Sequence, residues 1–135
     1  MDKIFSFLDF SKTIHFTVDD EVYTSFQICS KDKNPLHTDI SFAIEKGFNG
    51  KVMYGNILNA FVSYAIGMEL PTPDVIIQTQ DIQFKQPVYL YDTINMIIKT
   101  EDIHESVNVV RLLFRFINQN NITVAKGHIQ IGILK

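Results

Sequence analysis

The sequence predicts an α+β fold in which an antiparallel β-sheet wraps around one long central helix. Residues 52–70 form the longest apolar stretch, carry no charge from Val52 to Met68, and repeat their apolar side chains at three- and four-residue steps. This pattern is typical of a helix that is buried on nearly all sides. Four strand-like segments follow it, and a sheet curled around the helix buries it economically.

Length and composition indicate one domain over residues 1–135. The chain has 135 residues, 46% of them hydrophobic, and a net charge of −3 without a basic block, which argues against nucleic acid as a partner. Gly55, Asn56, Asn59 and Ser63 interrupt the apolar stretch, so a core helix is favoured over a membrane span. A single cysteine excludes an internal disulfide and no signal peptide is evident, so we expect a cytoplasmic protein.

Several shorter elements are expected before the central helix. Ile14, Phe16 and Val18 alternate with polar residues, which predicts a strand. Acids such as Asp19 and Asp39 can accept hydrogen bonds from the free N–H groups at helix starts. The expected elements are a strand (residues 12–18), a helix (21–29) capped by Asp19 or Asp20, a polar turn (32–37), and a short helix to Lys46 capped by Thr38 or Asp39.

Four strands are expected after Pro73. They span residues 75–85, 92–100, 107–117 and 122–134. The polar residues 101–106 predict a turn near His104. The run Asn118–Asn121 predicts a hairpin turn, because asparagine tolerates positive φ. Gly127 lies inside the last strand, where a bulge is expected.

The polar turn from Asp32 to His37 contains a candidate acid–base pair. Asn34-Pro35 is a turn signal, and the side chains of Asp32 and Asn34 can accept from nearby backbone N–H groups and stiffen the bend. Such a bend can direct a carboxylate and an imidazole into one small volume, where they exchange protons near neutral pH. The alternative interpretation is a surface turn that contains a histidine by chance.

Three ordered blocks of residues carry a resemblance to a known family. They are Ser30-Lys31-Asp32-Lys33-Asn34-Pro35-Leu36-His37 with Asp39 and Ala43; Tyr54-Gly55-Asn56-Ile57-Leu58 with Ser63, Gly67 and Leu70-Pro71; and Gln80, Phe84, Pro87-Val88 and Asp92. These blocks resemble the MaoC-type (R)-specific enoyl-CoA hydratases, over nearly the whole chain from about Ile14. The resemblance implies a single hot-dog domain.

The resemblance also implies a reaction, the reversible addition of water to a trans-2-enoyl thioester to give a (3R)-3-hydroxyacyl thioester. Asp32 and His37 match the catalytic pair that activates the water, and Asn34 matches a residue that orients them. Gly55 would donate its backbone N–H to the thioester carbonyl, and Ser63 would line the substrate pocket. The alternatives are a plain helix-entry glycine and a packing serine.

The sequence departs from the family pattern at three positions. Lys31 stands where glycine or an acid usually precedes the catalytic aspartate. Tyr54 stands where histidine usually precedes the glycine, and Asn56 where methionine or leucine is usual. We expect Tyr54 and Asn56 to shape the pocket.

The resemblance implies no metal and no cofactor, with coenzyme A or acyl carrier protein as the substrate carrier. The sequence contains neither metal-ligand spacing nor a glycine-rich phosphate loop. A homodimer is expected, because hot-dog domains usually pair by joining sheet edges and an unpaired edge strand is a liability. Fatty-acid metabolism is the expected context.

Two other functions remain open: a hot-dog acyl-thioesterase and a non-catalytic subunit that binds acyl thioesters. Thioesterases of this fold commonly carry a carboxylate on or beside the central helix, whereas residues 52–68 contain no acid. Intact Asp32, His37 and Gly55 argue against a non-catalytic subunit, although Tyr54 keeps it open. Loss of the conjugated enoyl thioester without release of thiol distinguishes a hydratase from both.

Overall fold

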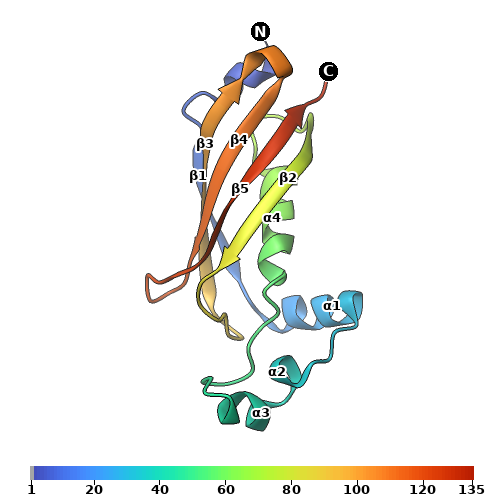
Figure 1. The fold of residues 1–135 in the computed structure, drawn as a ribbon, viewed down its shortest axis with the longest axis vertical. Coiled ribbons are helices and arrows are strands. Elements are labelled where there is room, and N and C mark those ends of the chain that lie inside the picture. The colour runs from blue at the N-terminus through green and yellow to red at the C-terminus, as the bar shows by residue number, and fades with distance from the viewer. Residues whose placement is uncertain (1) are drawn as a thin grey trace.

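The computed structural model describes residues 2–135 and contains one five-stranded antiparallel sheet with a long helix along one face (Figure 1). The strand order is β1-β3-β4-β5-β2, so β1 and β2 form the two edges. The strands are β1 (Ser11–Thr17), β2 (Val75–Phe84), β3 (Thr93–His104), β4 (Val109–Ile117) and β5 (Thr123–Ile133). The expected α+β class, with an antiparallel sheet packed on a central helix, is confirmed.

Four α-helices accompany the sheet, and three of them gather beyond one of its ends (Figure 1). They are α1 (Asp20–Ser30), α2 (Pro35–Thr38), α3 (Ile40–Glu45) and α4 (Ile57–Met68), and two 3₁₀ turns span Lys3–Phe7 and Glu105–Val107. As expected, Asp19 caps α1 and Asp39 caps α3. Within residues 2–135, no helix has both the length and the apolar character needed to cross a bilayer.

The central helix α4 packs its apolar face onto the sheet. Val62 on this helix is fully buried and shares one core cluster with fully buried strand residues such as Phe116. The other face of α4 exposes Ala60, Ser63 and Gly67. Burial on nearly all sides is therefore not achieved by the single chain, because one sheet layer covers only one side of a helix.

The central helix begins at Ile57, five residues after the expected start at Val52. Val52 is extended instead, and it forms an isolated bridge with Tyr89. Its N–H donates to the C=O of Leu36 (3.1 Å), and the N–H of Met53 donates to the C=O of Val88 (2.8 Å). These bonds to distant segments satisfy backbone groups that a longer helix would have used.

Strand β3 continues to His104, four residues beyond its expected end at Thr100. A register shift between Thr100 and Asp102 accommodates an irregularity in the ladder. The chain reverses later, at the 3₁₀ turn Glu105–Val107, followed by Asn108 with φ 58°. The turn expected near His104 is therefore present at Glu105–Val107, whereas the four residues before it belong to a largely exposed, paired strand.

The expected bulge at Gly127 is also absent, since this residue stays in register between Ile82 and Phe114. A Cβ atom here would lie 2.0 Å from the carbonyl oxygen of Asp81 and 2.7 Å from Cζ of Phe114. Glycine is needed because another backbone and a ring approach closely, which is the other common reason for a glycine inside a strand.

Candidate active site

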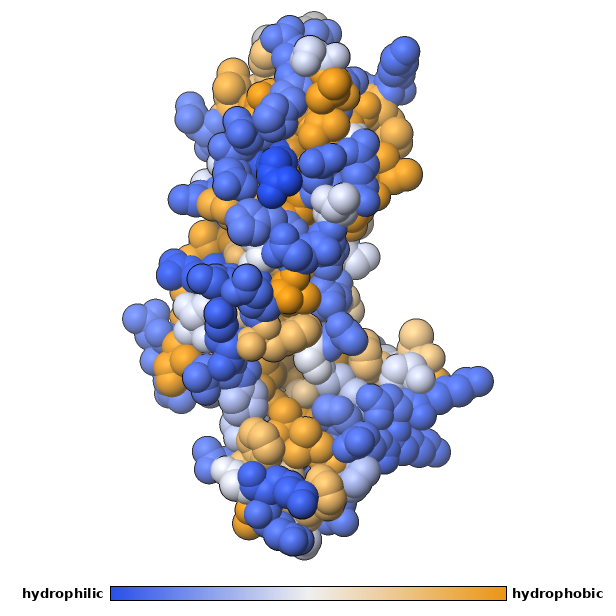
Figure 2. Space-filling model, viewed as in Figure 1, coloured by the Kyte–Doolittle hydropathy of each residue, from blue (hydrophilic) through white to orange (hydrophobic). Residues whose placement is uncertain are grey.

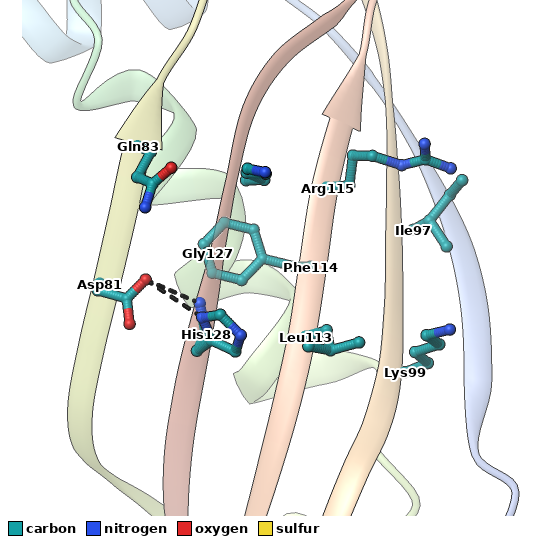
Figure 3. Close-up of a pocket in the computed structure, with 10 residues that line it drawn as sticks. Asp81, Gln83, Ile97, Lys99, Leu113, Phe114, Arg115, Gly127 and His128 are labelled. Atoms are coloured by element: carbon teal, nitrogen blue, oxygen red, sulfur yellow. Dashed lines mark hydrogen bonds and ion pairs between the residues drawn. The ribbon is translucent and has the colours of Figure 1, made fainter.

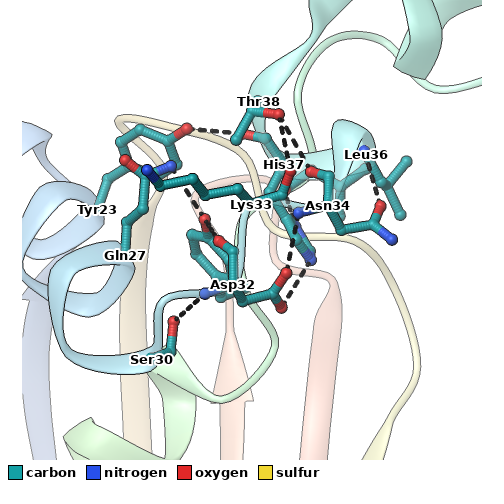
Figure 4. Close-up of polar contacts among 11 residues, drawn as sticks. Tyr23, Gln27, Ser30, Asp32, Lys33, Asn34, Leu36, His37 and Thr38 are labelled. Atoms are coloured by element: carbon teal, nitrogen blue, oxygen red, sulfur yellow. Dashed lines mark hydrogen bonds and ion pairs between the residues drawn. The ribbon is translucent and has the colours of Figure 1, made fainter.

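The loop between α1 and α2 brings Asp32 and His37 together (Figure 4). Asp32 Oδ2 lies 3.8 Å from His37 Nε2. Asp32 Oδ1 accepts the N–H of Asn34 (3.0 Å), and Asn34 Oδ1 accepts the N–H of Leu36 (2.9 Å), which caps α2. The expected stiff bend is observed, although its second limb is a short helix, α2, that was not predicted.

The two ring nitrogens of His37 have different roles. Nδ1 lies 2.6 Å from the C=O of Val52, and because a carbonyl only accepts, Nδ1 carries a proton and donates it. In the neutral ring Nε2 is then the proton acceptor, and Nε2 is the nitrogen near Asp32. The side chain of His37 is 16% exposed and that of Asp32 46%, so the pair opens to solvent on its carboxylate side.

Aromatic side chains from two parts of the chain surround His37. The ring centroid of Tyr54 lies 4.2 Å from that of His37, and the hydroxyl of Tyr23 donates to the C=O of His37 (2.7 Å). Phe26 packs against Tyr54, with 5.0 Å between ring centroids. Tyr23 and Phe26 were not predicted as site residues. The sequence feature that could have indicated them is their three-residue spacing, which places both on one face of the same helix.

Tyr54 is 3% exposed. Its hydroxyl donates to the C=O of Asp32 and accepts from Gln27 Nε2 (3.2 Å). Burial raises the pKa of the Tyr54 hydroxyl above its ordinary value; the Gln27 hydrogen bond opposes this shift, and the nearby Tyr23 and Asp32 add to it. The hydroxyl therefore remains protonated, and so remains a donor, at neutral pH.

A hollow of about 250 Å³ opens beside the acid–base pair. Its lining residues come from α1, the loop before α2, α2 itself, the loop before α4 and the end of β2: Phe26, Asp32, His37, Tyr54, Gly55, Asn56 and Phe84. Figure 2 shows the surface indented between the body of the sheet and the projecting α1. A second hollow, of about 340 Å³, shares His37, Gly55 and Phe84 with the first and has mainly apolar walls otherwise.

Gly55 lies two residues before α4, in the wall that the two hollows share. Of the backbone carbonyls of residues 2–135, none accepts its N–H. A Cβ atom here would lie 3.1 Å from Cε1 of Phe84, so glycine keeps the backbone accessible beside this ring. Asn56 makes no side-chain capping bond at the N-terminus of α4, and the first two N–H groups of the helix, those of Ile57 and Leu58, donate to the C=O groups of Tyr54 and Gly55.

The remaining predicted site residues lie in different places. Asn34 supports the pair through its backbone N–H and caps α2 with its side chain. Asn56 lines the first hollow and accepts from Asn59 Nδ2 (2.7 Å). Ser63 lies on the exposed face of α4 and lines neither hollow of the described chain, so one chain alone does not bring it to the pair.

A larger hollow, of about 420 Å³, lies on the sheet face that α4 does not cover (Figure 3). His128 on its wall lies 3.5 Å from Asp81 and 3.8 Å from Glu101. These are solvent-exposed polar contacts across the face of the sheet, which is an ordinary solvated arrangement. In the part of the chain that the structure describes, no group of three His, Cys, Asp or Glu is placed to hold a metal ion.

Residues 7–114 match the family model described as the MaoC like domain. The chain belongs to this MaoC-like family. The match spans more than half of the chain and includes both the Asp32–His37 bend and Gly55, which confirms the expected family.

Relatives of this MaoC-like chain support the same class. It is 28% identical over 103 residues to the (R)-specific enoyl-CoA hydratase of Aeromonas caviae, covering 76% of this chain and 77% of that protein. It is 28% identical over 101 residues to the mitochondrial 3-hydroxyacyl-[acyl-carrier-protein] dehydratase of Arabidopsis thaliana, covering 73% of this chain and 60% of that protein. Unliganded R-hydratase PhaJ1 of Pseudomonas aeruginosa superposes with a TM-score of 0.85 at 26% identity, covering 94% and 81% of the two chains. The expected hot-dog, hydratase-type enzyme is thereby confirmed.

Proposed function

We propose that this MaoC-like protein reversibly adds water to a trans-2-enoyl thioester and forms a (3R)-3-hydroxyacyl thioester. The observation that carries the proposal is the Asp32–His37 pair, 3.8 Å apart, in a hollow whose wall includes the free N–H of Gly55. Hydration of a conjugated thioester needs a proton acceptor and donor and a partner for the developing oxyanion. The relatives from Aeromonas caviae and Arabidopsis thaliana are named for hydration and dehydration, which supports a reversible reaction.

In the proposed reaction, one water molecule is held between the Asp32 carboxylate and His37 Nε2. The pair takes a proton from this water as its oxygen bonds to the β-carbon, and the electron pair of the double bond moves towards the thioester carbonyl. The Gly55 N–H and the α4 N-terminus stabilise the negative charge on the carbonyl oxygen. The pair then returns a proton to the α-carbon, so that one water is added overall.

We assign the apolar hollow to the acyl chain. It shares Gly55 with the catalytic hollow, and its volume of about 340 Å³ and apolar walls, such as Met53 and Leu58, suit a hydrocarbon chain. The carrier, coenzyme A or acyl carrier protein, would extend towards solvent past the half-exposed Asp32. The scheme uses no metal and no cofactor. We place it in the cytoplasm, in keeping with the single unpaired Cys29.

We also propose that the protein is a homodimer joined along β2. This strand has ten residues and pairs with β5 alone in the described chain, so one of its edges is open. The exposed face of α4 lies beside it, since Gln80 on β2 donates to Asn59 on α4 (2.5 Å). A second copy that joins β2 to β2 would pair this edge and cover the exposed face of α4.

A steady-state assay with crotonyl-CoA and a longer trans-2-enoyl-CoA tests the proposed activity. We expect the absorbance of the conjugated thioester to fall without release of free thiol, and the product to have the 3R configuration. Release of thiol would identify a thioesterase instead. Binding of the thioester without either reaction would identify a non-catalytic binding subunit.

A further inference from the structure

We propose that Tyr54 is a positioning residue that holds Asp32 and His37 at their reactive separation. The proposal rests on the function proposed above and adds a residue to its machinery. From the sequence, Tyr54 was expected only to shape the pocket, and the positioning role proposed here goes beyond that expectation.

The segment that bears the catalytic pair contributes little to the core. Neither α1 nor α2 has a buried residue, and α3 has only Ala43. Partly buried residues of α1, such as Val22 and Phe26, pack against the core, but they precede the bend and do not by themselves set the distance between Asp32 and His37. A core side chain that reaches both residues has a correspondingly large influence on that distance, because packed interiors hold their side chains in fixed places.

Tyr54 reaches both residues from the core. Its side chain belongs to the buried cluster, its hydroxyl donates to the C=O of Asp32, and Gln27 Nε2 donates to the same hydroxyl (3.2 Å). Its ring lies against His37, at 4.2 Å between centroids and an interplanar angle of 31°. Figure 4 shows Gln27, Asp32 and His37 drawn together in this region, with α1 on one side and α2 on the other.

The hydroxyl and the ring act on different members of the pair. The hydroxyl fixes the backbone of Asp32, whereas the ring restricts the imidazole of His37. Without the hydroxyl, His37 would still be held by the ring and by its bond to the C=O of Val52. Asp32 would keep only local bonds, from its own N–H to Ser30 Oγ (3.2 Å) and from the Asn34 N–H to its carboxylate (3.0 Å), and nothing would tie it to the core, so its carboxylate would move relative to Nε2.

Tyr54→Phe tests this role, because phenylalanine keeps the ring and removes only the hydroxyl. With crotonyl-CoA we expect kcat to fall by about tenfold to a hundredfold, while KM changes by less than about twofold, because alignment of the pair affects chemistry more than substrate binding. Tyr64→Phe is the matched control. It removes a hydroxyl that donates to Glu69 (3.1 Å), away from both hollows, and should leave both constants unchanged.

A double-mutant cycle with Asp32→Asn separates positioning from a general structural effect. If Tyr54 acts through the Asp32 carboxylate, Tyr54→Phe should cost less than about twofold in kcat once that carboxylate has been replaced. Equal fold losses in the two backgrounds would overturn the proposal.

Backbone ¹⁵N relaxation over residues 30–38 gives a readout that does not depend on activity. We expect order parameters of about 0.85 in the wild type and a fall towards about 0.6 at Asp32 in Tyr54→Phe. An unchanged profile would overturn the positioning role even in an active hydratase. An inactive wild type whose loop loosens in Tyr54→Phe would instead overturn the proposed function and retain the positioning role.

Discussion

The two ring nitrogens of His37 determine which atom of the site can exchange a proton. Its Nδ1–H is committed to the C=O of Val52, which leaves Nε2 to exchange a proton, and the Asp32 carboxylate lies 3.8 Å from it. A general base needs a free lone pair within reach of the proton that it takes. Neither residue belongs to the buried hydrophobic core, so we expect the fold to tolerate a change at either.

We expect Asp32→Asn and His37→Ala each to lower kcat by about 10² or more, with an unchanged circular dichroism spectrum. Asp102 and His104 form an exposed pair of similar geometry, 3.6 Å apart, and provide matched controls. Asp102→Asn and His104→Ala should keep wild-type turnover. Near-normal turnover in either active-site variant would contradict the assigned roles.

Gly55→Ala tests the amide donor. The added methyl group would lie 3.1 Å from the ring of Phe84, which is 51% exposed and can move aside. We therefore expect the free energy of unfolding to fall by less than about 1 kcal/mol, while kcat falls by about tenfold or more because the methyl and the displaced ring occupy the thioester position. Urea unfolding and steady-state kinetics measure the two effects.

Gly50→Ala is the control for this substitution, because a Cβ atom at Gly50 meets nothing within 4 Å. It should leave both kcat and stability close to wild type. Full activity in Gly55→Ala would show that no ligand approaches this amide closely.

At the level of elements, α1 has no fully buried residue, and its ends and side-chain hydrogen bonds add to the partial burial of residues such as Val22 and Phe26. Asp19 caps its N-terminus, and Lys31, which follows its last residue as the C-cap, adopts φ 61°. A residue with a Cβ atom is strained in this left-handed region by about 1 kcal/mol or more, whereas glycine is not. Because Lys31 directly precedes Asp32, this strain is located at the catalytic bend.

Lys31→Gly should therefore raise the free energy of unfolding, by up to about 1 kcal/mol after the greater unfolded-state entropy of glycine is counted. Lys33→Gly is the control, because Lys33 is not among the positive-φ residues; there glycine should lower stability or leave it unchanged. Urea denaturation compares the three proteins. A less stable Lys31→Gly variant would show that the lysine side chain makes a stabilising contact worth more than the strain.

In the whole molecule, an unpaired strand edge and an uncovered helix face lie next to each other at one edge of the sheet. The open edge of β2 and the exposed face of α4 are neighbours, joined by the bond from Gln80 to Asn59. The opposite edge, β1, is shorter, with seven residues, and Phe16 on this strand already stacks on Phe61 of α4 at 4.2 Å. The proposed dimer therefore forms at β2, where pairing and burial are gained together.

Sedimentation at micromolar concentration should give a mass of twice the 15.5 kDa of one chain. Ala60→Arg places a long charged side chain on the exposed face of α4 and should shift the protein towards the monomer, because an unpaired charge is costly in an interface. Thr13→Arg, at an exposed position of β1, should leave the dimer intact. A monomeric wild type would rule out the proposed homodimer.

The acid–base bend could be predicted because its geometry is local. Asp32, Asn34 and His37 lie within one turn, and the hydrogen bonds that shape it join residues two positions apart. Tyr23 and Gln27 could not be assigned in this way. Their partners, the C=O of His37 and the hydroxyl of Tyr54, are 14 and 27 positions away, and nothing in the intervening residues specifies that contact.

The amino-acid sequence alone determined the order of the five strands, the helices α1, α3 and α4, and the bend with Asp32 and His37, but not the short helix α2. Each of these depends on side-chain periodicity or on hydrogen bonds between near neighbours. Only the tertiary structure decided that α4 begins at Ile57, that Gly127 is confined by an adjacent strand, and that Tyr54 contacts both members of the pair. These features depend on contacts between residues that are far apart in the sequence, and local sequence patterns carry no information about such contacts.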